Sequence, residues 1–210
     1  MTSRRRWLLT IPVALGLFAA ACRDATAPLP AGNATGLQAD YMADGFTPCI
    51  LQQAPTAPPL ETYQISFWAR HDRETNVAVN YQSGDPYLSV RIPRFGLKWA
   101  PDGSRIQGSD SVLITMTLDP VYLTVRFEPS GLTFSDVFPA QLVISYANAN
   151  PDLNGDGVVN ITDWLLKLRL GIWSQSERTP GWVRVGSKNN TTQQFVTGYI
   201  YHFSEYALSW

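Results

Sequence analysis

Apolar and polar residues alternate with a period of two in six stretches of the chain between residues 63 and 146. In the first stretch, Tyr63, Ile65 and Phe67 share one face, while Gln64 and Ser66 share the other. The other five stretches are residues 77–81, 88–92, 112–118, 121–127 and 142–146. Because successive side chains of a strand point to opposite faces, each stretch predicts a strand with one buried and one solvated face.

Turn-forming clusters of Gly, Pro, Asp and Ser separate these stretches, at residues 83–86, 101–103 and 129–131. Two further apolar runs lie near residues 183–185 and 195–203. Short strands with turn signals at this spacing indicate an all-β fold, an antiparallel β-sandwich. We place this domain at residues 61–210 and expect no long helix in it.

Residues 22–60 have no such pattern. They are rich in Ala, Pro, Gly, Thr and Asn, with no period of two or 3.6. This composition predicts a flexible tether that precedes the sandwich. The alternative is an irregular edge of the domain, to which residues 41–50 would belong.

The first 21 residues have the pattern of a cleavable signal peptide. Arg4, Arg5 and Arg6 precede an uncharged, mostly apolar stretch over residues 7–21, which ends in three alanines. That stretch is too short for a bilayer, whose apolar core needs about 20 helical residues. We therefore expect an exported protein.

Cys22 follows the three alanines directly. This junction resembles the lipobox of bacterial lipoproteins, although Ala19 stands where that family usually has Leu, and the resemblance implies acylation of Cys22. Residues 3–8 also resemble a twin-arginine signal, with Trp7 where Phe is usual. The expected location is the periplasm or the cell surface, with a lipid in the membrane.

The chain has two cysteines, Cys22 and Cys49. If Cys22 is acylated, Cys49 is alone and there is no disulfide framework. If Cys22 is not acylated, the two could pair in an oxidising compartment.

Charge argues against nucleic acid as a partner. The formal net charge is −1 and only 16% of residues are charged, and no run of Lys or Arg follows the signal peptide. The remaining candidate partners, besides the membrane, are an envelope protein or a glycan.

Three motifs resemble the β-sandwich module shared by ankyrins, netrin receptors and tight-junction scaffolds. They are FEPSGLTF at residues 127–134, PAQLVISY at 139–146 and HFSEYAL at 202–208. The resemblance covers residues 87–146 and 182–208 and implies a binding or scaffolding sandwich, not an enzyme.

Residues 152–163, DLNGDGVVNITD, have the spacing of a twelve-residue calcium loop. Ca²⁺ takes six to eight oxygen ligands, and such loops supply them at positions 1, 3, 5, 7, 9 and 12. Gly157 at position 6 allows a turn at positive φ, and we expect Val159 to anchor the loop in the core. The predicted ligands are the side chains of Asp152, Asn154, Asp156, Asn160 and Asp163 and the carbonyl of Val158.

Asp163 stands where an EF-hand has Glu, and this ending resembles the loops of dockerins. Dockerins carry two such loops and this chain has one, so a complete dockerin is not expected. We interpret the loop as an insertion in the sandwich. A short helix over residues 161–168 should follow it and turn into a strand near Arg169.

Two weaker signals give alternative functions. Residues 202–204, His-Phe-Ser, resemble a self-cleavage site between Phe203 and Ser204, although a strand end with a buried Phe203 is the simpler reading. Four tryptophans would suit a sugar-binding platform if one sheet face carried them: Trp68, Trp99, Trp173 and Trp182.

No motif of a hydrolase, metalloprotease or phosphate-binding loop is present, so we do not expect an enzyme. The expected function is that of an exported, lipid-anchored, calcium-binding β-sandwich with a binding or structural role at the cell envelope. The first alternative is an accessory carbohydrate-binding or dockerin-like module of a glycan-degrading system. The second is a self-cleaving module.

Overall fold

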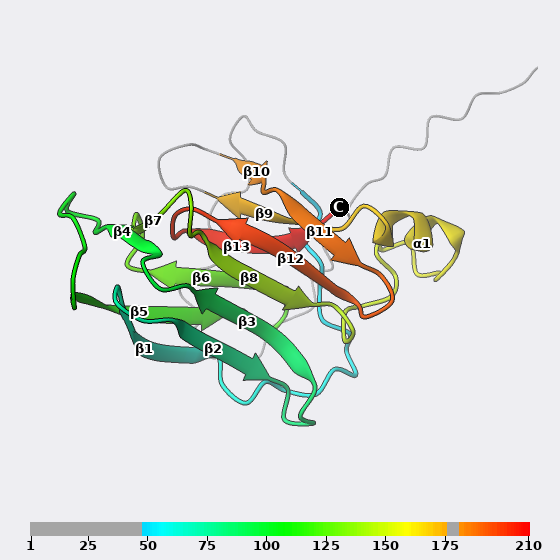
Figure 1. Cartoon of the computed structure of the whole chain (residues 1–210). Helices are drawn as coiled ribbons and strands as arrows, with labels where there is room; N and C mark the ends of the chain where they lie inside the picture. Colours follow the sequence, from blue (N-terminus) through cyan, green and yellow to red (C-terminus); the bar gives the residue numbers. More distant parts are fainter. Residues whose placement is uncertain (1–47, 176–180) are drawn as a thin grey trace, which may run out of the picture.

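The computed structural model describes residues 48–175 and 181–210. Two antiparallel sheets lie one in front of the other as two layers (Figure 1). The six-stranded sheet has the order β1 (Gln64–Arg70), β5 (Ser111–Leu118), β6 (Thr124–Glu128), β13 (Glu205–Ser209), β9 (Gly171–Gln175) and β10 (Trp182–Arg184). The five-stranded sheet has the order β11 (Ser187–Asn190), β12 (Phe195–Ile200), β8 (Ala140–Ser145), β3 (Pro86–Ile92) and β2 (Thr75–Asn80).

Two smaller elements complete the described fold. The strands β4 (Leu97–Trp99) and β7 (Thr133–Phe134) form a separate pair, and α1 (Ile161–Lys167) is the one helix of the described residues. The prediction of an all-β antiparallel sandwich with a short helix is thus confirmed.

The predicted alternation of buried and exposed positions is present in the strands. In β5, Ile114, Met116 and Leu118 are buried and the residues between them are not. Side chains from the inner faces of both sheets form one apolar core, including Val90 of β3 and Leu142 of β8. Val121 is an exception, because it lies in the turn before β6 and is exposed.

Residues 48–60, which the sequence assigns to the tether, lie on the sandwich. Ile50 forms a bridge with Ser209 and Gln52 forms one with Tyr122. Leu51 and Leu60 are buried in the core. The folded domain therefore begins before the expected boundary at residue 61. The stretch shows no strand periodicity because it pairs through isolated bridges and not as a continuous strand.

The predicted insertion connects the two sheets. It starts after β8 of the five-stranded sheet and ends at β9 of the six-stranded sheet. As expected, a short helix follows the loop and a strand follows the helix. The helix spans residues 161–167 and the strand starts at residue 171. Loop and helix project from one end of the sandwich (Figure 1).

Candidate calcium loop

Asp163 closes the loop of residues 152–163. Its Oδ1 accepts hydrogen bonds from the backbone N–H of Leu153 at 2.8 Å and of Asn154 at 3.3 Å. Its Oδ2 accepts one from the backbone N–H of Asn160 at 2.8 Å. The last predicted ligand is thereby held against the first residues of the loop.

The same carboxylate begins α1. Asn160 is the N-cap, its side chain accepts from the N–H of Thr162 at 2.7 Å, and Asp163 completes a capping box. Asp163 is 3% exposed and is the one buried residue of the helix. A single aspartate therefore fixes both the loop and the start of the helix.

Asp152, the first position, organises the opposite side of the loop. Its Oδ1 accepts from the backbone N–H of Gly155 at 2.9 Å and of Asp156 at 3.2 Å, and its Oδ2 accepts from Gly157 at 2.8 Å. Gly155 and Gly157 have φ of 70° and 85°. Glycine adopts this left-handed backbone at little cost, so the predicted role of Gly157 is confirmed.

Asp156 is held by its neighbours in the loop. Its Oδ2 accepts from the Asn154 amide at 2.9 Å, and its Oδ1 accepts from the Val158 N–H at 2.8 Å. The bond from the Asn154 side chain, and then that from the Val158 backbone, lower the pKa of the Asp156 carboxyl below its usual value. Asp156 is therefore ionised at neutral pH.

The two remaining predicted ligands bond to each other. The Asn160 amide donates to the Val158 carbonyl at 3.0 Å. The six predicted ligands thus lie in one loop whose side chains are held by hydrogen bonds to one another and to the loop backbone.

The chemistry of these donors suits a hard cation. They are oxygens alone, with neither nitrogen nor sulfur among them, as Ca²⁺ prefers. Carboxylate oxygens each accept about two hydrogen bonds, and the Oδ2 atoms of Asp152, Asp156 and Asp163 accept one apiece. Each therefore keeps an electron pair for a ligand. Within residues 48–175 and 181–210, no three Asp, Glu, His or Cys side chains already converge at metal-binding distance.

Val159 does not anchor the loop as expected. It and Val158 are both exposed. The apolar contact with the core is made by Leu153, at position 2 of the loop. Asp163 holds this side of the loop in place, because it accepts hydrogen bonds from the N–H groups of Leu153 and Asn154.

Further contacts join α1 to the five-stranded sheet. The Asn189 amide of β11 donates to the Lys167 carbonyl at 2.7 Å. The Lys167 ammonium lies 5.5 Å from the centre of the Tyr146 ring, and the Tyr146 hydroxyl donates to Asn189 at 2.8 Å. These residues carry no signal in the sequence, because the contacts join segments more than 20 residues apart.

The His-Phe-Ser segment lies at the start of β13. Phe203 is buried and stacks on Phe127 with ring centres 4.6 Å apart. The Ser204 hydroxyl donates forward to the Glu205 carbonyl at 3.2 Å. These contacts favour the structural interpretation, in which Phe203 is a core residue.

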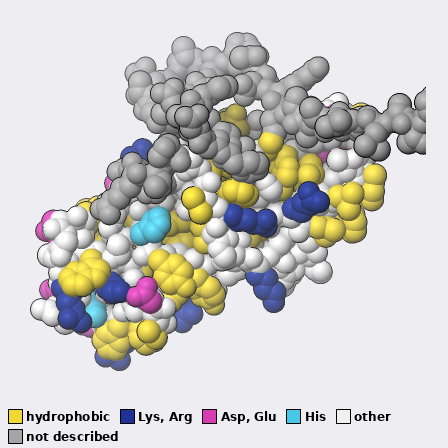
Figure 2. Space-filling view, turned by 90° about the horizontal axis from the view of Figure 1, so that it is seen from above, with side chains coloured by type: hydrophobic (Ala, Val, Ile, Leu, Met, Phe, Trp, Pro, Cys, Tyr) yellow, Lys and Arg dark blue, Asp and Glu magenta, His cyan; other side chains and the backbone are white. Residues whose placement is uncertain are grey.

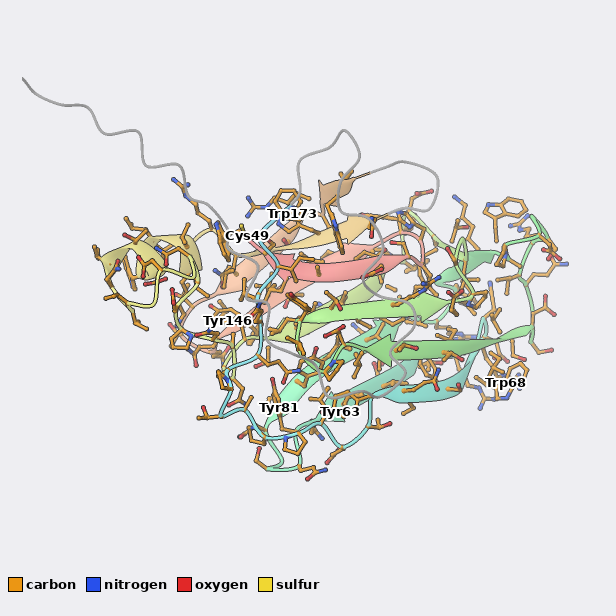
Figure 3. All side chains as sticks on the ribbon, turned by 180° about the vertical axis from the view of Figure 1, so that it is seen from behind. Cys49, Tyr63, Trp68, Tyr81, Tyr146 and Trp173 are labelled. Atoms are coloured by element: carbon orange, nitrogen blue, oxygen red, sulfur yellow. The ribbon has the colours of Figure 1, made fainter. Side chains whose placement is uncertain are left out.

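The four tryptophans do not form one platform. Trp68 is 64% exposed on β1, whereas Trp182 is 6% exposed on β10, at the opposite edge of the same sheet. Trp173 lies on β9, well separated from Trp68 in Figure 3. Trp99 is 40% exposed on β4, outside the two large sheets. The alternative of a platform made by all four tryptophans on one sheet face is therefore wrong.

Cys49 is disulfide-bonded, and its carbonyl accepts a hydrogen bond from the Ser209 hydroxyl at 2.6 Å (Figure 3). The sequence has one other cysteine, Cys22. Cys22 and the predicted signal peptide lie outside the described residues. Since an acylated sulfur cannot also form a disulfide, the lipid anchor and a Cys22–Cys49 bridge exclude each other in any one molecule.

Comparison with family models, curated proteins and solved structures finds no match to this chain. The resemblances to the ankyrin-type module, to dockerin loops and to lipoproteins therefore rest on their motifs alone. In the residues that the structure describes, no helix is long and apolar enough to cross a membrane.

Proposed function

We propose that this chain is an exported envelope protein whose β-sandwich binds one Ca²⁺ in the loop of residues 152–163, and that it is lipid-anchored in those molecules in which Cys22 is not bridged to Cys49. The ligands are Asp152, Asn154, Asp156, Asn160, Asp163 and the carbonyl of Val158. The bound ion offsets two of the three carboxylate charges and ties the loop together, and the role of the sandwich is binding or structural.

The observation that carries the calcium proposal is the closure of the loop by Asp163. Its bonds to Leu153, Asn154 and Asn160 bring position 12 beside the start of the loop. A ligand set spread over twelve residues binds an ion only if its ends meet. Buried at 3% exposure, the Asp163 carboxylate is held in place before any ion arrives.

Calorimetric titration of the mature chain with Ca²⁺ tests this proposal. We expect one site, with an affinity like that of extracellular modules, about 10⁻⁴ M. Asp156→Ala should abolish the binding heat, because it removes an exposed carboxylate of the loop. Asp102→Ala, which removes an exposed carboxylate from a distant turn, should leave it unchanged. Titration without a binding heat, or equal binding by both variants, would refute the site.

The lipid anchor is tested by partition into Triton X-114. The protein from bacterial membranes should enter the detergent phase, and Cys22→Ser should move it to the aqueous phase. Non-reducing mass spectrometry of the same material distinguishes the alternative, since a Cys22–Cys49 bridge lowers the mass by two hydrogens and an acylated chain is heavier. A bridged, water-soluble chain would overturn the anchor and leave the calcium proposal standing.

A glycan-binding role is the second candidate. Trp68 is 64% exposed and pairs across the sheet with the exposed Leu113, beside a polar ladder that includes the 2.8 Å bond between Ser66 and Thr115. An exposed aromatic among hydroxyl groups suits a sugar ring. Loss of glycan-array binding in Trp68→Ala would support this role, and the absence of binding by the unmodified protein would exclude it.

A further inference from the structure

The helix α1 has its apolar face turned to solvent. Ile161, Trp164, Leu165 and Leu168 lie at i, i+3, i+4 and i+7, which is the spacing of one helical face. Such a face normally packs on the core. Here these residues are 46–67% exposed.

Asp163 explains the orientation. It lies on the opposite face and is buried, because its carboxylate accepts the loop N–H groups. The helix therefore turns its carboxylate inward and its hydrophobic residues outward. The exposed hydrophobic residues of the helix and the exposed Val158 and Val159 before it make up one patch, which we call the apolar tip. Its members are Val158, Val159, Ile161, Trp164, Leu165 and Leu168.

Basic residues lie next to the apolar tip. Arg169 follows α1, and the Arg184 guanidinium donates to its carbonyl at 2.8 Å. Figure 2 shows Lys and Arg side chains beside hydrophobic ones on the α1 side of the molecule. Apolar residues with a basic border are the composition of helices that lie in anionic membrane interfaces.

The chain also leaves the domain at this end. The described residues start at Pro48, and Ile50 forms a bridge with Ser209, which pairs with Gly171. Gly171 is three residues beyond Leu168 of the apolar tip. The 26 residues from Cys22 to Thr47 could reach at most about 90 Å. A lipid on Cys22 would thus keep the apolar tip within reach of the membrane that holds it.

We propose that the apolar tip docks into the interface of the membrane that carries the anchor, with Trp164 and Leu165 inserted among the lipid headgroups. This inference rests on the proposed envelope function. Tryptophan is enriched at such interfaces, and the basic border favours anionic lipid. The loop and border carry Lys167, Arg169 and Arg184 against Asp152, Asp156 and Asp163, so 3 − 3 = 0. A bound Ca²⁺ raises this to +2 and should strengthen docking.

Vesicle flotation tests the proposal on the mature chain with Cys22→Ser and Cys49→Ser, which can neither be acylated nor form a bridge. The chain should float with phosphatidylcholine vesicles that contain phosphatidylglycerol, and less with phosphatidylcholine alone. Trp164→Gln with Leu165→Gln should weaken binding roughly tenfold or more. The matched control is Val137→Gln with Phe138→Gln, a comparably exposed adjacent pair before β8 that should bind unchanged.

Three results would overturn membrane docking: a parent chain that stays with the buffer, an α1 variant that floats as well as the parent, or a control variant that loses as much binding. Sedimentation velocity tests the alternative occupant, a second copy of the chain. If the parent chain does not bind vesicles but forms a dimer, and only the α1 variant is monomeric, the apolar tip is a contact between two copies instead. Flotation that persists while calorimetry finds no Ca²⁺ site would refute the calcium proposal and leave docking intact.

Discussion

At the scale of single residues, the buried side chain of Asp163 is held by the backbone and not by an opposite charge. Its carboxylate accepts three backbone N–H bonds. Glu205 of β13 is the contrasting case. It lies between Arg126 and Gln175 on the neighbouring strands, and burial raises the pKa of its carboxyl despite the opposing effect of Arg126.

The raised pKa of Glu205 gives a stability prediction. Folding favours the protonated carboxyl, so its contribution to stability is full below the unfolded pKa of about 4.3 and is lost as pH rises through the folded pKa. Glu205→Gln should therefore raise the melting temperature at pH 7, and the gain should shrink towards pH 4. A change of about 1 kcal/mol in the free energy of unfolding would shift the melting temperature by about 2–4 °C.

The control for Glu205 is Glu61→Gln, which removes an exposed negative charge outside the sheets. It should leave the melting temperature unchanged. A lower melting temperature for Glu205→Gln at pH 7 would mean that the attraction to Arg126 outweighs the burial of the carboxylate.

At the scale of elements, the loop and α1 form one unit that is pinned by a buried side chain. Seven residues are too few for a stable helix in isolation. The capping box of Asn160 and Asp163 and the contact of Asn189 with the helix end hold α1 in place. The element is thus determined by its polar contacts, while its apolar face is exposed.

Asp163→Asn should destabilise the protein even without calcium. The amide keeps one acceptor but turns an NH₂ group towards backbone N–H donors, and a buried unsatisfied group costs about 1–3 kcal/mol. Urea unfolding in the presence of a chelator measures the effect. Asp156→Asn is the matched variant, because its carboxylate is exposed and should matter little without the ion. Equal stability of the two variants would contradict the pinning role of Asp163.

At the scale of the molecule, the sequence revealed those parts of the fold that alternate. The patterns that include Val90, Ile114 and Leu142 predicted β3, β5 and β8, because burial of one face imposes a period of two. The edge strand β11 is polar throughout and gave no signal, since it forms by backbone pairing with β12. Residues 48–60 were missed for a similar reason.

The candidate site could also be predicted only in part from the sequence. Ligand spacing identified the loop, because oxygen donors in a calcium loop recur at fixed positions. The orientation of the loop could not be read from it. Val159 is apolar and was expected to point inward, but the bonds that Asp163 makes across the loop favour Leu153 there. The outward face of α1 follows from the same carboxylate.

The position of the loop means that an ion bound there would act on the whole sandwich. The loop joins β8 of one sheet to β9 of the other, and Leu153 contacts the common core. An ion that orders this connection should therefore stabilise both sheets together. Binding to the folded state alone contributes RT ln(1 + [Ca²⁺]/Kd), about 2.7 kcal/mol at a hundredfold excess over Kd.

The most direct test of this account is the melting temperature of the mature chain by scanning calorimetry, with Ca²⁺ and with a chelator. The account predicts one transition that rises by about 5–10 °C with Ca²⁺, and no rise in Asp156→Ala. A transition that does not move with Ca²⁺, or that moves equally in Asp156→Ala, would contradict it.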